Sequence, residues 1–450
     1  MARGGVAYKC RACGYQTPQW LGRCPQCGEW ETLAAIEHDG RAAEAQDPPA
    51  RPQSLADIPP ESAVRRPTGL GEFDRVLGGG ALAGSTILLG GEPGIGKSTL
   101  MLQVAGLVAA RAERPWLYVS GEEAPAQIKL RAGRLGIGDA AKLFVLGEQR
   151  VGAVTEAVRE ADAEGLVVDS IQTIFSGAVK EGPGSPQHVG DVAFELNRLA
   201  KQLKIPVFLI GHVTKEGEFA GPKAIEHLVD VALYLEGGRE GEVRILRAVK
   251  NRYGSTEEIG VFQMAEVGLQ EITDPSRYFT ERSGEVKPGS VIVPSLEGSR
   301  PILVEIQSLV TGSRAAMPQR RATGLDYNRV ALLMAVVEKR LGLQIGRDDV
   351  YLNIAGGLSV RETAVDLGVA AAVVSSYKNR AIDADTIVVG ELGLSGELRR
   401  VRKLPERLKE AAKLGFARAV VPPGTKGLDD LELDVMAATG LEEAIEYLGL

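Results

Sequence analysis

The sequence is poor in cysteine and histidine, with only four of each among 450 residues. All four cysteines lie within the first thirty residues, whereas a secreted, disulfide-linked protein would distribute them through its domains. From residue 286 onwards there is neither cysteine nor histidine, which excludes a cysteine–histidine nucleophile pair there. No apolar run could span a bilayer, and no signal-peptide core is visible. We therefore expect a soluble, cytoplasmic protein without membrane association.

An excess of positive charge is also missing. The net charge is −7, so any binding of nucleic acid must use local basic patches. The apolar content of 44% is sufficient for sizeable cores, and the length favours about three domains.

A phosphate-binding loop follows the apolar run Thr86–Leu89. The spacing G-x4-G-K-S matches the loop pattern, and a helical stretch comes directly after it. Glycines let backbone N–H groups surround a phosphate, and the helix directs its positive end at the same anion. Lys97 can reach the β- and γ-phosphates, and Ser98 can hold Mg²⁺. The predicted ATP/ADP-binding residues are Gly91, Glu92, Pro93, Gly94, Ile95, Gly96, Lys97, Ser98 and Thr99.

Acidic residues end two of the predicted strands. Asp169 closes the apolar run GLVVD, a Walker-B pattern, and is expected to hold Mg²⁺ together with Ser98. Glu122 and Glu123 follow the strand WLYVS, and one of them could activate the attacking water. The pattern by itself does not decide between these two glutamates.

The cysteines form two CxxC pairs, each followed by a glycine that permits a tight turn. Four thiolates suit a closed, tetrahedral Zn²⁺ site, with rubredoxin-type iron as the competing interpretation. Aromatic and basic residues nearby could contact nucleic acid or a protein, or the aromatics could cover a module too small to have a core of its own. The predicted metal ligands are Cys10, Cys13, Cys24 and Cys27.

Composition divides the chain into four parts. We expect a zinc module over residues 1–35, a proline-rich linker over 36–65, an ATPase domain over 66–275 and a last domain over 286–450. Strands and helices alternate in the ATPase domain, which predicts an α/β fold with a mostly parallel sheet. The last domain is predicted to be an α+β unit with its own core.

Two glycine-rich loops, residues 174–190 and 214–224, follow strands and carry lysines that could neutralise DNA phosphates. His212, at a strand end, could report the γ-phosphate to the second loop. Lys250 and Arg252 lie far along the sequence from the phosphate loop and could instead act on a neighbouring subunit's nucleotide, which requires an oligomer. The loop lysines are Lys180, Lys215 and Lys223.

The zinc module, the extended phosphate-loop string 68–99, the string YVSGEE and KNRYG together resemble the bacterial DNA repair protein RadA (Sms) family. This resemblance covers essentially the whole chain. It implies a RecA-like ATPase followed by a Lon-protease-like domain. Homo-hexameric rings of DnaB type are implied, which bind single-stranded DNA and extend branched intermediates made by RecA recombinase through branch migration.

Site roles carry over by motif. Glu122 matches the catalytic glutamate of the RecA-like pattern, and His212 stands at the position of the RecA glutamine sensor. Lys250 and Arg252 match the family's KNRFG signature, here with Tyr253 in place of phenylalanine. Lys97, Ser98 and Asp169 keep the roles derived above.

The C-terminal domain lacks the Lon catalytic pair. Ala364 stands at the position of the catalytic serine and Pro405 near that of the lysine, so peptidase activity is not expected. A ring platform and DNA-binding surface is the favoured interpretation. Its candidate basic residues are Arg314, Arg320, Arg321, Arg399, Arg400, Arg402 and Lys403.

Two functions are thus compared. The first is a DNA-dependent, helicase-like ATPase motor of recombination. The alternative is a nucleotide-switched module that binds DNA or a partner without translocating.

Overall fold

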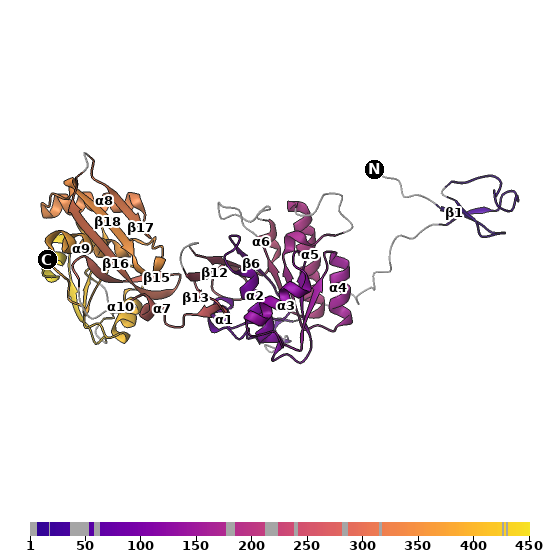
Figure 1. The fold of residues 1–450 in the computed structure, drawn as a ribbon, viewed down its shortest axis with the longest axis horizontal. Coiled ribbons are helices and arrows are strands. Elements are labelled where there is room, and N and C mark those ends of the chain that lie inside the picture. Colours follow the sequence, from indigo (N-terminus) through magenta and orange to yellow (C-terminus); the bar gives the residue numbers. More distant parts are fainter. Residues whose placement is uncertain are drawn as a thin grey trace. The chain divides into compact units, whose positions relative to one another are not determined.

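The computed structural model describes residues 7–17, 19–36, 54–57, 64–176, 185–211, 224–237, 242–280, 287–314, 317–424, 427–428 and 431–450. These residues fall into two compact units, residues 1–62 and residues 63–450 (Figure 1). None of the described helices is long and apolar enough to cross a membrane.

The first unit is built on a three-stranded antiparallel sheet with strand order β2-β1-β3. Its buried apolar residues are Cys10, Cys24 and Leu33, against which Tyr8 packs. A core this small cannot stabilise a domain by apolar burial, so the four cysteines must supply the cohesion. The elements are β1 (Ala7–Cys10), β2 (Gln16–Thr17), β3 (Leu33–Ile36) and the 3₁₀ helix η1 (Leu55–Asp57).

The second unit begins with a nine-stranded sheet. Six strands, from β11 to β8 in the sheet order, run parallel, and three antiparallel strands extend one edge. In sheet order they are β14 (Gly268–Glu271), β13 (Ile259–Ala265), β12 (Val243–Asn251), β11 (Val231–Glu236), β6 (Thr86–Gly91), β10 (Val207–Ile210), β9 (Gly165–Asp169), β7 (Trp116–Ser120) and β8 (Leu143–Gly147). The predicted α/β fold with a mostly parallel sheet is therefore confirmed.

Helices cover both faces of this sheet because its strands are apolar on both sides. Successive side chains of a strand point to opposite faces, so Ile87 and Leu89 pack in one buried cluster and Leu88 in the other. The first cluster contains α1 (Gly71–Leu77), α2 (Lys97–Ala109) and α3 (Pro125–Arg134). The second contains α4 (Val151–Glu160), α5 (Pro186–Leu203) and α6 (Ala224–Leu228). Smaller elements are the pair β4 (Arg65–Arg66) and β5 (Ala81–Leu82) and the 3₁₀ helix η3 (Ile171–Thr173).

A seven-stranded mixed sheet forms the rest of the second unit. In sheet order its strands are β17 (Arg320–Thr323), β18 (Asp348–Ile354), β16 (Arg300–Gly312), β15 (Ser290–Glu297), β19 (Thr386–Val388), β22 (Arg418–Val421) and β23 (Asp434–Ala437). The helices are α7 (Pro275–Phe279), α8 (Tyr327–Leu341), α9 (Asp366–Lys378), α10 (Leu404–Lys413) and α11 (Leu441–Tyr447). Short elements are η4 (Ile345–Arg347), η5 (Ala355–Gly357), η6 (Thr363–Val365) and the pair β20 (Glu391–Leu392) and β21 (Leu398–Arg399).

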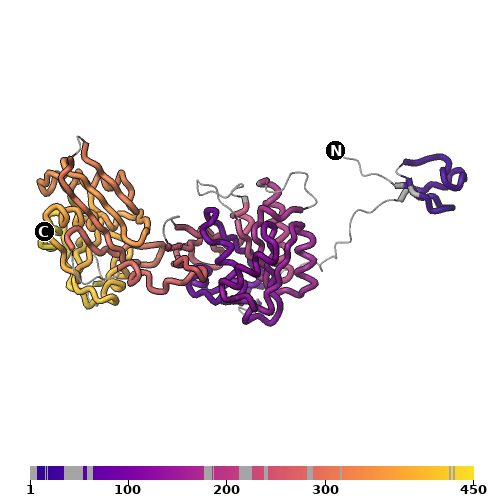
Figure 2. Tube along the Cα trace, in the orientation of Figure 1, coloured from indigo at the N-terminus to yellow at the C-terminus, as the bar shows by residue number. Residues whose placement is uncertain are grey.

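The core of this second sheet is shared with the first sheet. Val243 of β12 and Val261 of β13 belong to the same buried cluster as Val293 of β15 and Ile302 of β16. Each sheet nevertheless uses one continuous part of the chain, and the colours of the Cα trace in Figure 2 follow these parts in order along the sequence. The expectation of a C-terminal core of its own is thus only partly right, because the antiparallel extension β12–β13 contributes apolar side chains to it.

Candidate nucleotide site and metal centre

The phosphate loop joins the central strand β6 to helix α2. A Cβ atom at Gly91 would lie 2.6 Å from the carbonyl oxygen of Leu235, so only glycine fits this close approach. Gly96 has a φ of 114°, a value that residues with a side chain rarely adopt, and it precedes the first residue of α2. The N-terminus of a thirteen-residue helix therefore meets the loop at the carboxyl edge of the parallel strands, where such folds bind nucleotides.

Lys97 is held within this loop. Its Nζ donates hydrogen bonds to the carbonyl oxygens of Gly91, at 2.8 Å, and Glu92, at 2.9 Å. Burial lowers the pKa of Lys97 to about 8, while the nearby carboxylates of Asp169 and Glu122 act in the opposite direction. The loop thus places one ammonium group beside two carboxylates.

Asp169 ends β9 and contacts two hydroxyl groups. Its Oδ1 accepts a hydrogen bond from Ser98 Oγ at 3.1 Å, and its Oδ2 accepts one from Tyr118 Oη at 2.6 Å. Burial raises the pKa of Asp169, and these two hydrogen bonds oppose that shift. The structure therefore brings together the two residues expected to hold Mg²⁺. Hydroxyl and carboxylate oxygens are ligands that Mg²⁺ prefers, so the donor set fits this ion.

The two adjacent glutamates have different surroundings. Glu123 forms an ion pair with Arg131 of α3. Glu122 Oε1 accepts a hydrogen bond at 2.7 Å from Ser170 Oγ, which directly follows Asp169. Of the two glutamates after β7, Glu122 is therefore the one directed toward Asp169.

Lys250 and Arg252 lie elsewhere. Lys250 is paired across the sheet with Ala232, which is itself level with Leu88 of β6. The backbone N–H of Arg252 bonds to the carbonyl oxygen of Asp230, beyond the amino end of β11. Since β6 rises about 3.3 Å per residue, its five steps from Thr86 to Gly91 separate Arg252 from the phosphate loop by about 16 Å. One chain does not bring these groups together.

His212 and the lysines Lys180, Lys215 and Lys223 lie outside the described residues, as do residues 177–184 of the first glycine-rich loop and 214–223 of the second. In the first loop, residues 174–176 come after β9 and η3, at the same edge of the sheet as the phosphate loop, whereas residues 186–190 belong to helix α5. In the second loop only Ala224, the first residue of α6, is described.

Two residues of this site were missed by sequence reasoning. Tyr118 reads as an ordinary core residue of a strand, and only the string YVSGEE marked its neighbourhood. Arg244 of β12 is 7% exposed, and its Nε donates to the Ile95 carbonyl oxygen of the phosphate loop at 3.2 Å. No local pattern indicates that a residue so distant in sequence supports this loop.

The four cysteine sulfur atoms all lie within 4.8 Å of one another. Each CxxC pair is closed by a backbone hydrogen bond from the following glycine, from Gly14 N–H to Cys10 O at 3.0 Å and from Gly28 N–H to Cys24 O at 2.9 Å. Both glycines have positive φ, 80° and 76°. This geometry fits a tetrahedral ion with four thiolate ligands, as predicted.

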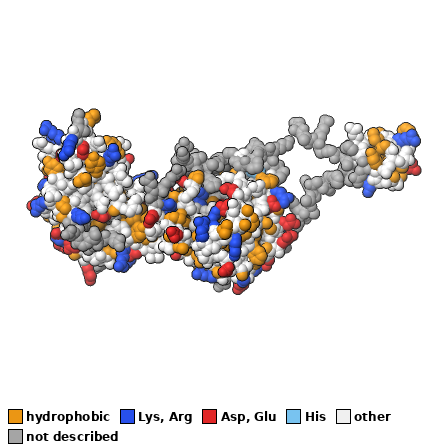
Figure 3. All heavy atoms as spheres, in the orientation of Figure 1, with side chains coloured by type: hydrophobic (Ala, Val, Ile, Leu, Met, Phe, Trp, Pro, Cys, Tyr) orange, Lys and Arg blue, Asp and Glu red, His pale blue; other side chains and the backbone are white. Residues whose placement is uncertain are grey.

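Aromatic side chains remain on the surface of this unit, where Figure 3 shows hydrophobic side chains among basic ones. Trp20 is 57% and Trp30 is 70% exposed, and the Arg23 guanidinium lies 5.6 Å from the Trp30 ring centre. Both rings are therefore accessible to a partner, and the two interpretations of these aromatics stay open.

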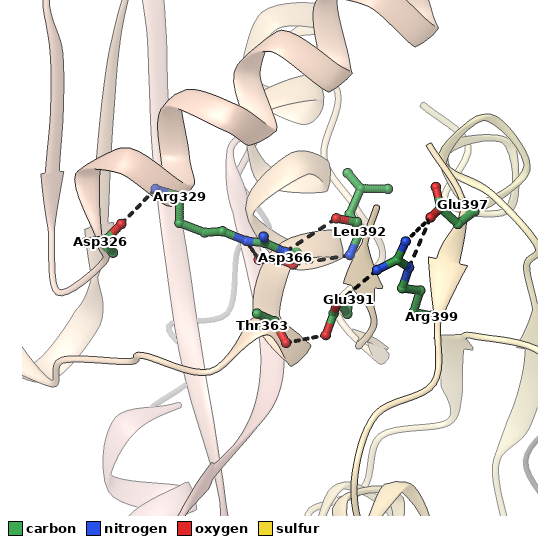
Figure 4. Close-up of polar contacts among 8 residues, drawn as sticks. All are labelled: Asp326, Arg329, Thr363, Asp366, Glu391, Leu392, Glu397 and Arg399. Carbon is green, nitrogen blue, oxygen red and sulfur yellow. Dashed lines mark hydrogen bonds and ion pairs between the residues drawn. The ribbon is translucent and has the colours of Figure 1, made fainter. Parts of the chain in front are cut away.

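Around the Lon-type serine position the C-terminal domain is apolar and well packed. Ala364 is 4% exposed and shares a buried cluster with Leu404 and Leu408 of α10. Arg329 binds the Asp366 carboxylate beside it, which also accepts the Leu392 N–H at 3.2 Å (Figure 4). These polar groups hold α9 to its neighbours.

Acidic partners accompany part of the predicted basic surface. Arg399 pairs with Glu397 at 2.6 Å (Figure 4), and Lys403 approaches Glu257 at 3.4 Å. Arg321 lies on the edge strand β17 and Arg314 follows β16, and both are exposed. The second group is therefore the better candidate for contacts with phosphates.

Three known families match successive parts of the chain. Residues 8–35 match the rubredoxin metal binding domain, residues 63–218 an AAA domain, and residues 328–425 subunit ChlI of Mg-chelatase. The first match contains the four cysteines and the second contains the phosphate loop and Asp169. Fold and sites thus define a P-loop ATPase with an AAA domain and an N-terminal four-cysteine zinc site.

Full-length relatives specify the class further. The DNA repair protein RadA of Pseudomonas aeruginosa is 46% identical over 455 residues, which cover 100% of both chains. That of Bacillus subtilis is 45% identical over 435 residues, 94% of this chain and 93% of the relative. The chain therefore belongs to the family of DNA repair protein RadA. A solved KaiC-like protein from Pyrococcus horikoshii is 21% identical, with a TM-score of 0.40, over 46% of this chain and 99% of that chain.

Proposed function

We propose that this chain is a DNA-dependent ATPase motor, which binds single-stranded DNA and promotes branch migration of strand-exchange intermediates made by RecA recombinase. One observation carries the proposal. Lys97, Ser98, Asp169 and Glu122 meet at the carboxyl edge of the sheet, while Lys250 and Arg252 lie at its amino edge. A ring of identical subunits would place the second set against a neighbour's nucleotide, and we propose a homo-hexamer.

Each residue then has a definite task in hydrolysis. Lys97 exchanges its loop carbonyl partners for oxygens of the β- and γ-phosphates. Ser98 and Asp169 would hold Mg²⁺, which would neutralise charge on these phosphates. Glu122 accepts a proton from the water whose oxygen attacks the γ-phosphorus. The bond between the γ-phosphorus and the oxygen that bridges it to the β-phosphate breaks, and ADP leaves with that oxygen. His212 relays the state of the γ-phosphate to the following loop.

DNA contacts are assigned to loops at the carboxyl edge. Residues 174–190 follow β9 and residues 214–224 follow β10, which lies between β9 and β6, and each loop carries lysine. Exposed Arg314 and Arg321 of the C-terminal domain offer a second contact with the phosphate backbone. Tracking of the strand by these loops couples turnover to movement.

Measurement of ATP hydrolysis with and without single-stranded DNA tests the motor. We expect stimulation by DNA and loss of hydrolysis in Lys97→Ala. An equal rate with and without DNA would refute the motor function.

The alternative is a nucleotide-switched binding module. It would bind DNA and hydrolyse ATP, yet a three-strand branched substrate would show no movement of the branch point. Branch movement that requires ATP hydrolysis decides for the motor.

A further inference from the structure

Tyr118 is a fully buried tyrosine in the middle of β7, with 0% of its surface exposed. Its ring packs in the apolar cluster that contains α2, where phenylalanine would fill the same space without a polar group to satisfy. A buried hydroxyl group costs free energy unless it forms a hydrogen bond. This hydroxyl donates to Asp169 Oδ2 at 2.6 Å.

This contact divides the Asp169 carboxylate between two partners. Oδ2 is bound from the interior of the sheet by Tyr118, and Oδ1 is bound by Ser98 at 3.1 Å. Register supports the arrangement, because β7 and β9 are parallel neighbours and Ser120 lies opposite Asp169. The phenol therefore restricts rotation of the carboxylate about its own side-chain bonds.

We propose that Tyr118 is a positioning residue, which holds Asp169 with Oδ1 directed at Ser98 so that these two oxygens form the divalent-cation site of the ATPase. This inference rests on the proposed ATPase function and adds a residue to it. Some residues do not touch the metal but form hydrogen bonds to its ligands. Removal of such a residue commonly lowers metal affinity or activity by about 10- to 100-fold.

A purely structural role makes a different prediction. If Tyr118 only fills the core and satisfies its hydroxyl, Tyr118→Phe would change the melting temperature and leave the requirement for Mg²⁺ as it was. If it orients Asp169, the same variant keeps its packing and needs more Mg²⁺.

The test uses the chain of 450 residues and measures the rate of ATP hydrolysis as a function of the free Mg²⁺ concentration at saturating ATP. For Tyr118→Phe we expect half-maximal activity at about tenfold higher Mg²⁺. Tyr447→Phe is the matched control, since its phenol also donates to a carboxylate, Glu443 at 2.8 Å, but on the surface of α11. An unchanged Mg²⁺ requirement in a folded Tyr118→Phe protein would overturn the proposal.

A second measurement does not depend on hydrolysis. Binding of a fluorescent ADP analogue with and without Mg²⁺ gives the enhancement that the ion provides. Asp169→Asn should reduce this enhancement strongly but leave a measurable part of it, Tyr118→Phe should reduce it less, and the double variant should equal Asp169→Asn. An additive loss in the double variant would show that Tyr118 does not act through Asp169. Absence of hydrolysis in the unaltered protein would refute the ATPase, and this binding cycle would still test Tyr118.

Discussion

Lys250 Nζ donates a hydrogen bond to the carbonyl oxygen of Val229 at 2.7 Å, and a second one of the same length to the backbone carbonyl oxygen of Glu226. The residue that resembles a helicase finger thus binds the C-terminal end of α6 in its own chain. Desolvation lowers the pKa of Lys250, and the neighbouring charge of Arg252 acts in the same direction. Arg252 is more accessible, with 55% of its side chain exposed, and lies 3.8 Å from Asp230.

Arg252→Ala should reduce DNA-stimulated hydrolysis by about a thousandfold, because a cation supplied in trans stabilises charge on the transferred phosphoryl group. Steady-state phosphate release measures the loss. Arg252 is a better position to substitute than Lys250. Removal of the Lys250 side chain would also break its hydrogen bonds to the end of α6, so the loss of activity could come from lower stability.

Mixing distinguishes a neighbour's arginine from the subunit's own. Subunits with Arg252→Ala keep an intact phosphate loop, and subunits with Lys97→Ala keep an intact Arg252. If Arg252 acts across a subunit boundary, a mixture of the two inactive proteins regains hydrolysis. A mixture that stays inactive, although the two proteins co-assemble, would contradict the assignment.

Glu122→Gln should lower the rate constant of hydrolysis by about 10²- to 10⁴-fold, the usual contribution of a general base, with nucleotide affinity retained. Glu123→Gln is the matched control at the next position. It loses only the partly exposed ion pair with Arg131, so near-normal hydrolysis is expected. Single-turnover measurements check both variants. A severe loss in Glu123→Gln alone would reverse the assignment of the base.

Cys10→Ser, or removal of zinc by a chelator, should unfold the first unit and leave the second one intact. The reason is that residues 1–62 and 63–450 are separate compact units, and the first has almost no apolar core. Zinc content and thermal unfolding provide the measurement, with basal hydrolysis as the functional check. Collapse of the ATPase on zinc removal would show that the module is not autonomous.

Breaking the buried ion pair between Arg407 and Glu362 should destabilise the C-terminal domain. The Arg407 side chain is 1% exposed, and Glu362 is its carboxylate partner. Glu362→Gln leaves that guanidinium without its counter-charge, at a cost of about 3 kcal/mol in the free energy of unfolding. Urea unfolding followed by circular dichroism measures it.

The control for this pair is Arg399→Ala. Its ion pair with Glu397 is at the surface, with 59% and 39% of the side chains exposed. We expect a change below about 1 kcal/mol. Equal effects of the two substitutions would contradict the role assigned to burial.

Local spacing made the nucleotide loop and the four-cysteine site predictable. In both cases neighbouring residues along the chain form the site, and glycines at positive φ are required, as at Gly96 and Gly14. The alternation of strands and helices likewise predicted the parallel sheet, because a parallel connection needs a crossover helix. The shared core between the two sheets was not predictable, since Val261 and Val293 belong to separate segments of the pattern.

By itself, then, the sequence determined that this protein has a nucleotide-binding loop and a four-cysteine zinc site. Only the tertiary structure decided how the remaining groups are arranged. It paired Glu123 with Arg131, placed the Tyr118 hydroxyl on Asp169 and put Lys250 at the edge opposite the phosphate loop. Strand order and register decide such contacts, and they arise from the packing of the whole sheet rather than from neighbours along the chain.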